Sequence, residues 1–432
     1  MSINPAGDYN PKKLAHAVAG IQGAIWHHSA LSAPAVREAH PAGNRAAHSG
    51  KEHEGARNAG SPFSTAGRVS SCTVELVSDY ETLLRLKPAW DRLAEESDVS
   101  HPFLTFEWIQ TWWECFGAGK GLHILLVKNN GKLKAIAPLM RSTEKKYGVS
   151  VRQLGLIYNP HAPRCDFLVA RDAKGVYPAV WRHLWSHRSE WDVLALCQLP
   201  SDSRTLLKFR RYASAGRFPW GIWKGEKSPY LLIGTPNGYP DGTCRKEEKN
   251  LKNRFNRLQK LGQPDLEVIT QADATLNDGL RLEAAAWKAG SGTAIVSDPA
   301  VCAFYSKLAE RAALRGWLRL YFLSVRNRRI AFTYSLSYKQ RLFLLKPGYD
   351  PDCAQYAPSR LLLSLTLRNA LAQGITEYDL LGSDDEWKLK WTNEVRPHSW
   401  LFIYPRTPRG FLLHGLKFGL LRRICKMPSA FF

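Results

Sequence analysis

The sequence lacks the features that mark several classes of protein. No two cysteines form a C-x-x-C pair, and none lies at zinc-ligand spacing from a histidine. No G-x-S-x-G segment is present and no cysteine lies in a protease signature, which disfavours a serine or cysteine hydrolase. No apolar run reaches the roughly 18 residues needed to cross a bilayer, and the N-terminal residues do not resemble a secretory signal. We therefore expect a cytoplasmic protein with reduced thiols and no metal.

Acidic residues are few compared with basic ones. The 432 residues include 60 Lys and Arg but 38 Asp and Glu, which gives a formal charge of +22 at pH 7. This excess predicts a polyanionic partner: nucleic acid, an anionic membrane surface or a phosphate-rich cofactor. Apolar residues make up 44% of the chain and aromatic residues 11%, which indicates a globular protein long enough for two domains.

Residues 1–70 contain few large aliphatic side chains and show no sustained periodicity. This composition predicts a disordered tail. The tail holds six of the 13 histidines, and their irregular spacing favours a solvated segment over a metal site. They are His16, His27, His28, His40, His48 and His53.

From Cys72 onward, strand and helix patterns follow in an order that occurs twice. Residues 72–234 show a strand, two amphipathic helices, an apolar hairpin turning at Asn130-Gly131, and then alternating helix and strand patterns. Residues 244–405 repeat this order after a basic helix, with antiparallel strands over 318–350 and a helix over 356–374. We call these ranges the first unit and the second unit. Together they predict a duplicated α/β (α+β) protein.

Four segments carry a family resemblance: FLTFEWIQTWWECFG, EAAAWKAGSG, KPGYD followed by YAPSRLLL, and DLLGSDDEWKLKW. In this order and spacing, residues 72–405 resemble the GNAT acyltransferase superfamily. The likeness is specifically to CelD-like or BioF-type acetyltransferase domains, which are related to Fem-type aminoacyl transferases. The resemblance implies two tandem GNAT-like units, each a mixed twisted sheet flanked by helices. It also implies acyl-CoA as the co-substrate.

The resemblance assigns cofactor binding to the helix that begins near Tyr356, Ser359 and Arg360. In GNAT proteins, the N-terminal amides of this helix bind the pyrophosphate of acyl-CoA while pantetheine lies between two diverging parallel strands. Pro358 suits the first turn of such a helix and Gly374 its end. The chain lacks the R-x-x-G-x-G/A loop of simple GNAT enzymes, and an arginine that is merely solvated at a helix start is the alternative reading of Arg360.

Asp379, Gly382 and Lys388 follow the family's D-x-x-G…K pattern. Asp379 ends a predicted strand, so it is expected to orient or deprotonate the acceptor, with Lys388 binding a phosphate or the acyl carbonyl. The alternative is that Asp379 caps the following turn and that Lys388 is a surface cation. Tyr349 could donate a proton to the departing thiolate or simply pack in a turn.

Three further residues are candidates for acceptor binding. Asp166 matches an acidic position of the first unit, although it could instead pair with Arg164. Trp108 belongs to an aromatic stripe that helix packing explains more readily than a sugar platform. Trp287 precedes a glycine-rich turn that would let the backbone approach a ligand, or that could simply end a helix.

The C-terminal segment, residues 406–432, contains six cations and no acid, interleaved with leucine and phenylalanine. A stripe through Leu412, Leu416, Leu420 and Ile424 suggests docking onto anionic lipid, hence a location at the inner face of the membrane. The basic helix at 246–262 has a solvated face by default.

The leading hypothesis is an acyl-CoA-dependent N-acyltransferase acting on a cell-envelope precursor. The resemblance implies an amino sugar of exopolysaccharide biosynthesis as acceptor, either free or linked to a lipid; ceramide-type lipid N-acylation is also open. A Fem-like transferase using aminoacyl-tRNA is the second hypothesis, with the basic face as a tRNA groove. A non-catalytic subunit of a polysaccharide assembly machine is the third.

Overall fold

The computed structural model describes residues 72–420 except 235–240 and 286–293, and gives the backbone alone for residues 241–248 and 420. The contacts place the described residues in one compact unit. The predicted tail, residues 1–70, lies outside the described residues, as does the end of the 406–432 segment. Among the helices of the described ranges, none is both long and apolar enough to cross a bilayer.

The first unit begins with a strand and three helices, continues as an antiparallel meander and ends with alternating helices and strands. Asn130 and Gly131 both adopt positive φ, 49° and 75°, and form the tight turn predicted between β2 and β3. Its elements are β1 (Cys72–Val77), α2 (Tyr80–Arg85), α3 (Lys87–Glu96), η2 (Pro102–Leu104), α4 (Phe106–Phe116), β2 (Gly121–Asn129), β3 (Lys132–Lys146), β4 (Val149–Leu156), β5 (Leu168–Val169), α5 (Val176–Ser186), η3 (Arg188–Glu190), β6 (Val193–Pro200), α6 (Arg204–Ala215) and β7 (Trp220–Leu232).

The second unit follows the same order after a long basic helix, α7. Pro358 is the first residue of α11, as predicted from the absence of its N–H. Its elements, with those that follow it, are α7 (Asp241–Gln259), β8 (Pro264–Ile269), α8 (Thr275–Ala285), η4 (Ile295–Ser297), α10 (Pro299–Leu314), β9 (Leu318–Val325), β10 (Arg328–Tyr338), β11 (Arg341–Tyr349), η5 (Pro351–Tyr356), α11 (Pro358–Ala372), β12 (Glu377–Asp379), α12 (Glu386–Leu389), β13 (Val395–Ile403), α13 (Pro408–His414) and η6 (Gly415–Leu420).

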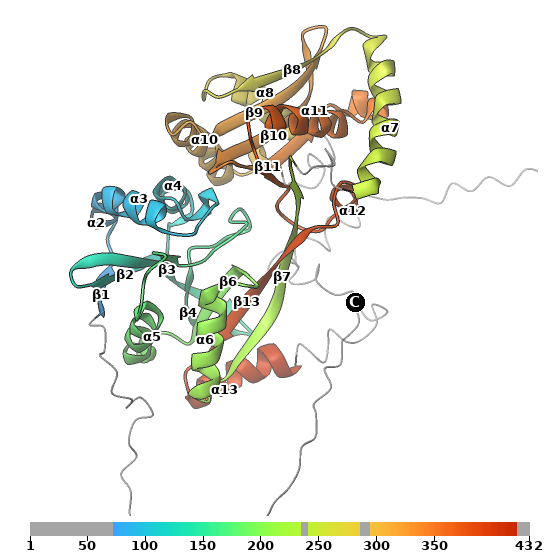
Figure 1. The fold of residues 1–432 in the computed structure, drawn as a ribbon. Helices are drawn as coiled ribbons and strands as arrows, with labels where there is room; N and C mark the ends of the chain where they lie inside the picture. Colours follow the sequence, from blue (N-terminus) through green and yellow to red (C-terminus); the bar gives the residue numbers. More distant parts are fainter. Residues whose placement is uncertain (1–71, 235–240, 286–293, 421–432) are drawn as a thin grey trace, which may run out of the picture. The chain divides into compact units, whose positions relative to one another are not determined.

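The strands of both units join in one mixed sheet. Its order is β1-β2-β3-β4-β6-β13-β7-β12-β11-β10-β9-β8, with β5 paired to β3. Figure 1 shows β7 and β13 as a long antiparallel pair that links the two parts of the sheet. β13, from the second unit, lies between β6 and β7 of the first, while the end of β7 pairs with β12. The units therefore exchange strands, which the sequence did not indicate.

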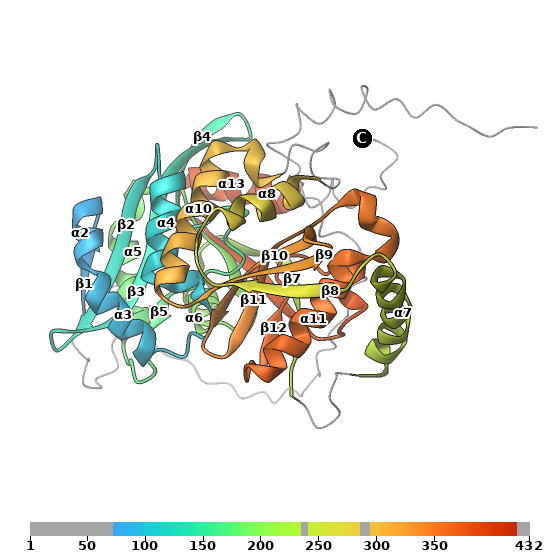
Figure 2. The ribbon, with the colours of Figure 1, turned by 90° about the horizontal axis from the view of Figure 1, so that it is seen from above.

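Helices from both units share one core. Trp90 and Trp108 of the first unit belong to the same buried cluster as Phe304 and Phe322 of the second. Figure 2 shows α4 beside α10, the helices that bring the two units into contact in this cluster. On the other side of the sheet, α5 and α6 cover the strands of the first unit, and α11 covers β9, β10 and β11. The space between the units on the shared side is thus filled by helices.

The predicted mixed α/β fold is confirmed, with corrections to individual elements. The sequence patterns did not reveal β4 and α6, and they confined the last strand of the first unit to residues 230–233, whereas β7 begins at Trp220. β4 alternates apolar and polar residues over only a few positions. α6 carries arginines on its solvent-exposed face. The strand pattern of β4 and the helix pattern of α6 were both weaker than the turn signals of the residues around them.

Candidate active site

The parallel strands β11 and β12 are paired over three residues and then diverge. Arg341, Leu342 and Phe343 pair with Glu377, Tyr378 and Asp379. β11 continues to Tyr349, but β12 ends at Asp379, so the two backbones separate after Phe343. We call this divergence the splay. The first unit has a corresponding short parallel pairing, Gln153–Gly155 of β4 with Val193–Ala195 of β6.

β11 carries a bulge directly beyond its last pair with β12. Tyr334 of β10 faces Lys346, and the next residue, Ser335, faces Leu344. Leu345 is therefore an extra residue in β11, and bulges of this kind leave one peptide outside the ladder. A backbone N–H at that point is suited to donate to a developing oxyanion. β4 of the first unit pairs with β3 without such a shift from Val149 to Leu156, so the bulge belongs to the second unit's splay.

The head of α11 lies at the end of the segment that follows β11. Its N-cap residue, Ala357, has φ 51° and makes no side-chain capping hydrogen bond. By contrast, the side chains of Thr105, Ser203 and Asp298 cap α4, α6 and α10. An alanine side chain cannot accept from the first-turn amides. Pro358 has no N–H and the N–H of Arg360 donates to the carbonyl oxygen of Ala357 at 3.0 Å, so the N–H of Ser359 is the first-turn donor suited to an anion. Ser359 and Arg360 stand in this first turn, as predicted, and both are partly buried.

Two arginines of α7 reach the same head. Arg254 Nη1 donates to the carbonyl oxygen of Gln355 at 2.8 Å. The guanidinium of Arg257 lies 5.7 Å from the ring centre of Tyr356, the predicted cofactor-binding tyrosine. The cationic face of α7, expected to be only solvated, thus contributes charge beside the head of α11.

Asp379 lies in a buried ion network rather than on a cleft wall. Its side chain is 0% exposed, and Oδ2 accepts from Arg164 and from Arg396, each at 2.7 Å. Oδ1 accepts the N–H of Leu381 at 3.0 Å, which confirms the alternative that Asp379 caps the following turn. Arg164 comes from the first unit, so this carboxylate joins the two units. The suggested pairing of Arg164 with Asp166 is replaced by this one.

Lys388 is buried as well, so the alternative reading of it as a surface cation was wrong. Its Nζ donates to the carbonyl oxygens of Leu381 at 2.8 Å and Ser383 at 2.9 Å, and lies 3.0 Å from a carboxylate oxygen of Asp385. Leu381 and Gly382 both have positive φ, 50° and 61°. A leucine in this region is strained, by about 1–3 kcal/mol. Lys388 therefore holds the loop that borders the splay after β12.

The ion network extends to further residues of β12 and β13. Arg396 Nη2 lies 3.2 Å from both carboxylate oxygens of Glu377. Arg164 Nε donates to His398 Nε2 at 3.3 Å. Burial, with the nearby charge of Arg164, lowers the pKa of His398 to about 4, and burial likewise holds the pKa of His101 well below its usual range. Both rings are neutral at pH 7, and the charge of the network resides on its arginines and carboxylates.

A second group of side chains meets beside the splay on the shared side of the sheet. His161 of the first unit is joined to the hydroxyl of Tyr305 by a hydrogen bond of 3.3 Å from Nδ1. Nζ of Lys346, the residue after the bulge, lies 5.4 Å from the ring centre of Tyr305. The His161 ring also stacks on Phe116, with centroids 5.9 Å apart. Burial, with the charge of Lys346, lowers the pKa of His161 to about 4. Sequence reasoning missed this group, because its members are far apart in the chain.

The remaining predicted residues lie apart from the splay or at its rim. Tyr349 ends β11, is partly buried and packs against the core under α11. Asp166 accepts the N–H of Phe167 at 2.7 Å, and burial raises the pKa of its carboxyl. Trp108 is 2% exposed and packs edge-on against Phe103 and Phe304 in the shared core. Trp287 lies outside the described residues.

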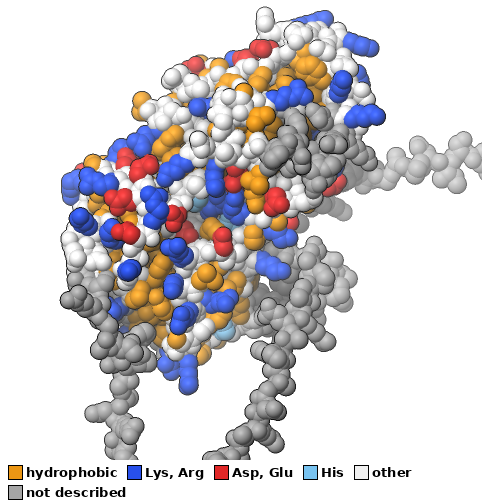
Figure 3. Space-filling model, viewed as in Figure 1, with side chains coloured by type: hydrophobic (Ala, Val, Ile, Leu, Met, Phe, Trp, Pro, Cys, Tyr) orange, Lys and Arg blue, Asp and Glu red, His pale blue; other side chains and the backbone are white. Residues whose placement is uncertain are grey.

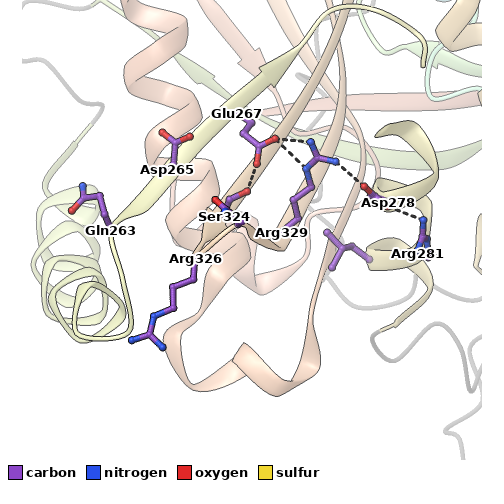
Figure 4. A pocket seen from close by; sticks show the side chains of 10 residues that line it. Gln263, Asp265, Glu267, Asp278, Arg281, Ser324, Arg326 and Arg329 are labelled. Carbon is purple, nitrogen blue, oxygen red and sulfur yellow. Dashed lines mark hydrogen bonds and ion pairs between the residues drawn. The ribbon is translucent and has the colours of Figure 1, made fainter. Parts of the chain in front are cut away.

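A hollow of about 830 Å³ lies at the β8 edge of the sheet, away from the splay (Figure 4). Arg329 lies between Glu267 and Asp278, at 2.6 Å and 2.7 Å from their carboxylates. The lining of the hollow also includes Asp265 and Arg326, so its acidic and basic side chains are equal in number. A site with compensated charge and no residue from the splay is a poor candidate for the reaction centre.

A second hollow, of about 590 Å³, runs between α7 and α11. We call it the α7–α11 groove. Its floor includes four apolar side chains, its rim includes three cations, and no acid of the described ranges lines it. These residues are Leu251, Phe255, Leu361 and Leu365, and Lys249, Lys252 and Arg368.

Comparison with known proteins identifies the part of the chain that contains the splay. Residues 245–389 match the family described as the acetyltransferase (GNAT) domain. The second unit contains a GNAT acetyltransferase domain. This match confirms the predicted GNAT family over the second unit, and with it the acyltransferase class of enzyme. No curated protein matches the chain.

Several solved structures are similar to this chain. L-PGS from Bacillus licheniformis is 11% identical, over 78% of this chain and 96% of that one, with a TM-score of 0.48. FemX is 9% identical, over 78% and 100%, with a TM-score of 0.49. A tandem GNAT protein from the clavulanic acid biosynthesis pathway is 13% identical, over 78% and 100%, with a TM-score of 0.42.

Proposed function

We propose that this protein is an acyl-CoA-dependent N-acyltransferase whose reaction occurs in the splay of the second unit. The observation that carries the proposal is the bulge at Leu345, which lies directly beyond the last pair of β11 with β12. The α11 head without a side-chain cap supports it, because it offers the N–H of Ser359 and the positive end of the helix dipole to a diphosphate. In the first unit, β4 has no bulge beside the corresponding pairing.

In this proposal, the donor is held from the side of α11. The N–H of Ser359 at the head of α11 binds the diphosphate, assisted by the side chains of Ser359 and Arg360 and by the aromatic side chain of Tyr356. Each charge at an exposed helix end contributes only about 0.3–1 kcal/mol, so the arginines of α7 beside this head add to the attraction. The pantetheine arm then passes between β11 and the loop after β12.

The chemistry needs no covalent enzyme intermediate. The amine nitrogen attacks the thioester carbonyl carbon, a C–N bond forms, and the C–S bond breaks with the electron pair leaving on sulfur. A backbone N–H at the Leu345 bulge donates to the carbonyl oxygen as it becomes an oxyanion. His161, neutral because its pKa is about 4, accepts the proton of the amine. Tyr349, at the end of β11, supplies the proton that the thiolate takes up.

Asp379 and Lys388 hold the site in this proposal, in place of the direct catalytic roles expected from their motif. Asp379 fixes the N–H of Leu381 and Lys388 fixes its carbonyl oxygen. Together they set the loop that forms the second wall of the splay. They are positioning residues, whereas His161 and the bulge amide would contact the substrates.

For the acceptor, we propose an amine on a cell-envelope precursor. The amino sugar of an exopolysaccharide is the first candidate and an amino lipid the second, both on the family resemblance. Release of free thiol from acetyl-CoA or a longer acyl-CoA, dependent on such an amine, is the expected result. If neither class of acceptor raises thiol release above hydrolysis while the protein binds CoA, the acceptor proposal is wrong. If no acyl-CoA binds, the donor proposal fails.

The α7–α11 groove favours a second candidate donor, an aminoacyl-tRNA. The cations on its rim, with no acid among its described lining residues, suit a phosphate backbone beside the α11 head. RNA that co-purifies with the protein and dissociates steeply with salt would support this donor. Transfer that proceeds from acyl-CoA at full rate after ribonuclease treatment would exclude it.

A further inference from the structure

The α7–α11 groove begins at the head of α11, where the diphosphate of the donor is proposed to lie. Leu361, the first α11 residue that lines the groove, stands two positions after Ser359, about 3 Å along the helix axis. On the α7 side, the lining residue Phe255 directly follows Arg254, which donates to the carbonyl oxygen of Gln355 at 2.8 Å. The groove therefore continues from the point at which a diphosphate would be held.

Two lysines on the rim of the groove have no acidic partner among the described residues. Lys249 and Lys252 are exposed, and neither forms an ion pair with another residue of the described ranges. Arg368 lines the α11 side. Figure 3 shows Lys and Arg side chains along the upper right edge of the molecule, where Figure 1 places α7. A group with more than one negative charge would be attracted to this rim, whereas a neutral ligand would gain nothing from it.

The floor and walls of the groove suit a planar ring with polar edges rather than an acyl chain. Phe255 and Leu365 are partly exposed, and an aromatic ring beside aliphatic side chains is a surface on which a base can stack. Asn256 and Gln259 of α7 and Ser364 of α11 also line the groove. Their amides and hydroxyl can form hydrogen bonds with the edge of a base. An acyl chain would cover these groups without giving them a partner, which costs free energy.

The size of the groove matches one nucleotide. Its volume, about 590 Å³, lies within the range of roughly 300–1,000 Å³ that is typical of small-molecule sites. A 3′-phosphorylated adenosine combines a planar base that has polar edges with a phosphate that carries close to two negative charges. In CoA this nucleoside is attached directly to the diphosphate. Its features are therefore those that the floor, the walls and the rim of the groove would recognise.

We propose that the α7–α11 groove binds the 3′-phosphoadenosine of the acyl-CoA donor. The adenine stacks on Phe255. Lys249 and Lys252 bind the 3′-phosphate, while the N–H of Ser359 binds the diphosphate. The inference rests on the proposed acyl-CoA donor and adds what selects it, because α7 makes the site specific for a 3′-phosphorylated nucleotide. The pantetheine arm leaves from the other end of the diphosphate and can enter the splay.

The test compares CoA with 3′-dephospho-CoA, which lacks only the 3′-phosphate, by calorimetric titration into the full chain. We expect the wild type to bind CoA at least about fivefold more tightly. Lys249→Gln/Lys252→Gln should lose this preference, through weaker binding of CoA and unchanged binding of dephospho-CoA. Lys132→Gln/Lys145→Gln removes two exposed lysines from β3 of the first unit. This control has the same change in net charge and should keep the preference.

Phe255→Leu tests the base separately from the phosphate. Leucine keeps an apolar floor but removes the aromatic ring, so the binding of CoA and of dephospho-CoA should weaken together, by about fivefold or more. The preference for CoA should remain in this variant. Thermal unfolding of each variant without ligand checks that it is folded.

The outcomes separate this inference from the proposed function. Equal binding of CoA and dephospho-CoA by the wild type, or an unchanged preference in Lys249→Gln/Lys252→Gln, overturns the inference and leaves the acyl-CoA donor standing. Binding of neither compound overturns both. Binding of a single-stranded oligoribonucleotide that depends on the two lysines, in a protein that does not bind CoA, would make the groove an RNA site and would also overturn the inference.

Discussion

Replacing Asp379 by asparagine separates a structural role of this residue from a catalytic one. The amide has nearly the same shape and keeps an oxygen that can accept the N–H of Leu381, but it lacks the charge. Arg164 is 3% exposed, and in the variant its guanidinium would remain buried without its carboxylate partner. Arg396 is less affected, because its side chain is 21% exposed and it also pairs with Glu377.

The expected loss of stability follows from this burial. Removing one partner of a buried ion pair costs about 3–5 kcal/mol, because the remaining charge is left uncompensated. Since Arg396 keeps a partner, we expect about 3 kcal/mol for Asp379→Asn. The matched control is Asp384→Asn, whose carboxylate is 40% exposed and pairs with a Lys227 side chain that is 50% exposed. Such exposed pairs contribute about 0–1 kcal/mol.

Urea unfolding followed by tryptophan fluorescence, together with thiol release at low temperature, distinguishes the two roles. A structural role predicts a lower unfolding midpoint for Asp379→Asn and no comparable change for Asp384→Asn. A general base predicts nearly unchanged stability and a loss of activity of about 10²-fold or more. The reasoning is refuted if Asp379→Asn is as stable as Asp384→Asn.

Two further predictions concern histidines with lowered pKa values. His398 has a folded-state pKa of about 4 against an unfolded value of about 6.5, so the unfolded state binds the extra proton and stability falls as pH decreases through this window. At pH 5 this one ring should account for about 2 kcal/mol of lost stability, and His398→Gln should show a correspondingly smaller loss between pH 7 and pH 5; an identical loss in both proteins would argue against it. His161→Gln should lower kcat by about 10²-fold or more without weakening the binding of CoA, measured by thiol release and calorimetry. An unchanged kcat would remove His161 from the proposed chemistry.

Much of the fold could be read from local patterns. The Asn130-Gly131 turn, the antiparallel strands over 318–350 and the start of α11 at Pro358 each rest on residues within a few positions of one another. Propensity and capping act over that range, so the sequence predicts such features well. The order of elements in both units followed from them.

The exchange of β7 and β13 could not be read in the same way. Which strand lies between β6 and β7 depends on pairing between residues that are far apart in sequence, and both candidate strands have similar apolar patterns. The same limit applies to the site. Arg164 and Asp379 are 215 positions apart, and His161 and Tyr305 are 144 apart.

The resemblance suggested direct catalytic roles for the motif around Asp379, whereas the contacts of these residues are structural. Asp379, Gly382 and Lys388 do act together, as their spacing suggests, but on the backbone of one loop. A carboxylate at the end of a strand faces a crevice only where nothing fills that crevice. Here Arg164 of the first unit fills it, and the sequence held no signal for that contact.

Calorimetric titration of CoA into the full chain tests the central claim most directly, with Ser359→Asp as the informative variant. A carboxylate in the first turn of α11 should stabilise the helix by about 0.3–1 kcal/mol, so the fold is preserved. It should repel a bound diphosphate by about 1–4 kcal/mol at a separation of about 4 Å. Asn277→Asp, exposed in the first turn of α8, adds the same charge elsewhere in the second unit. The account predicts binding by wild type and Asn277→Asp and at least about fivefold weaker binding by Ser359→Asp. Equal affinity in all three proteins, or no binding in any, would contradict it.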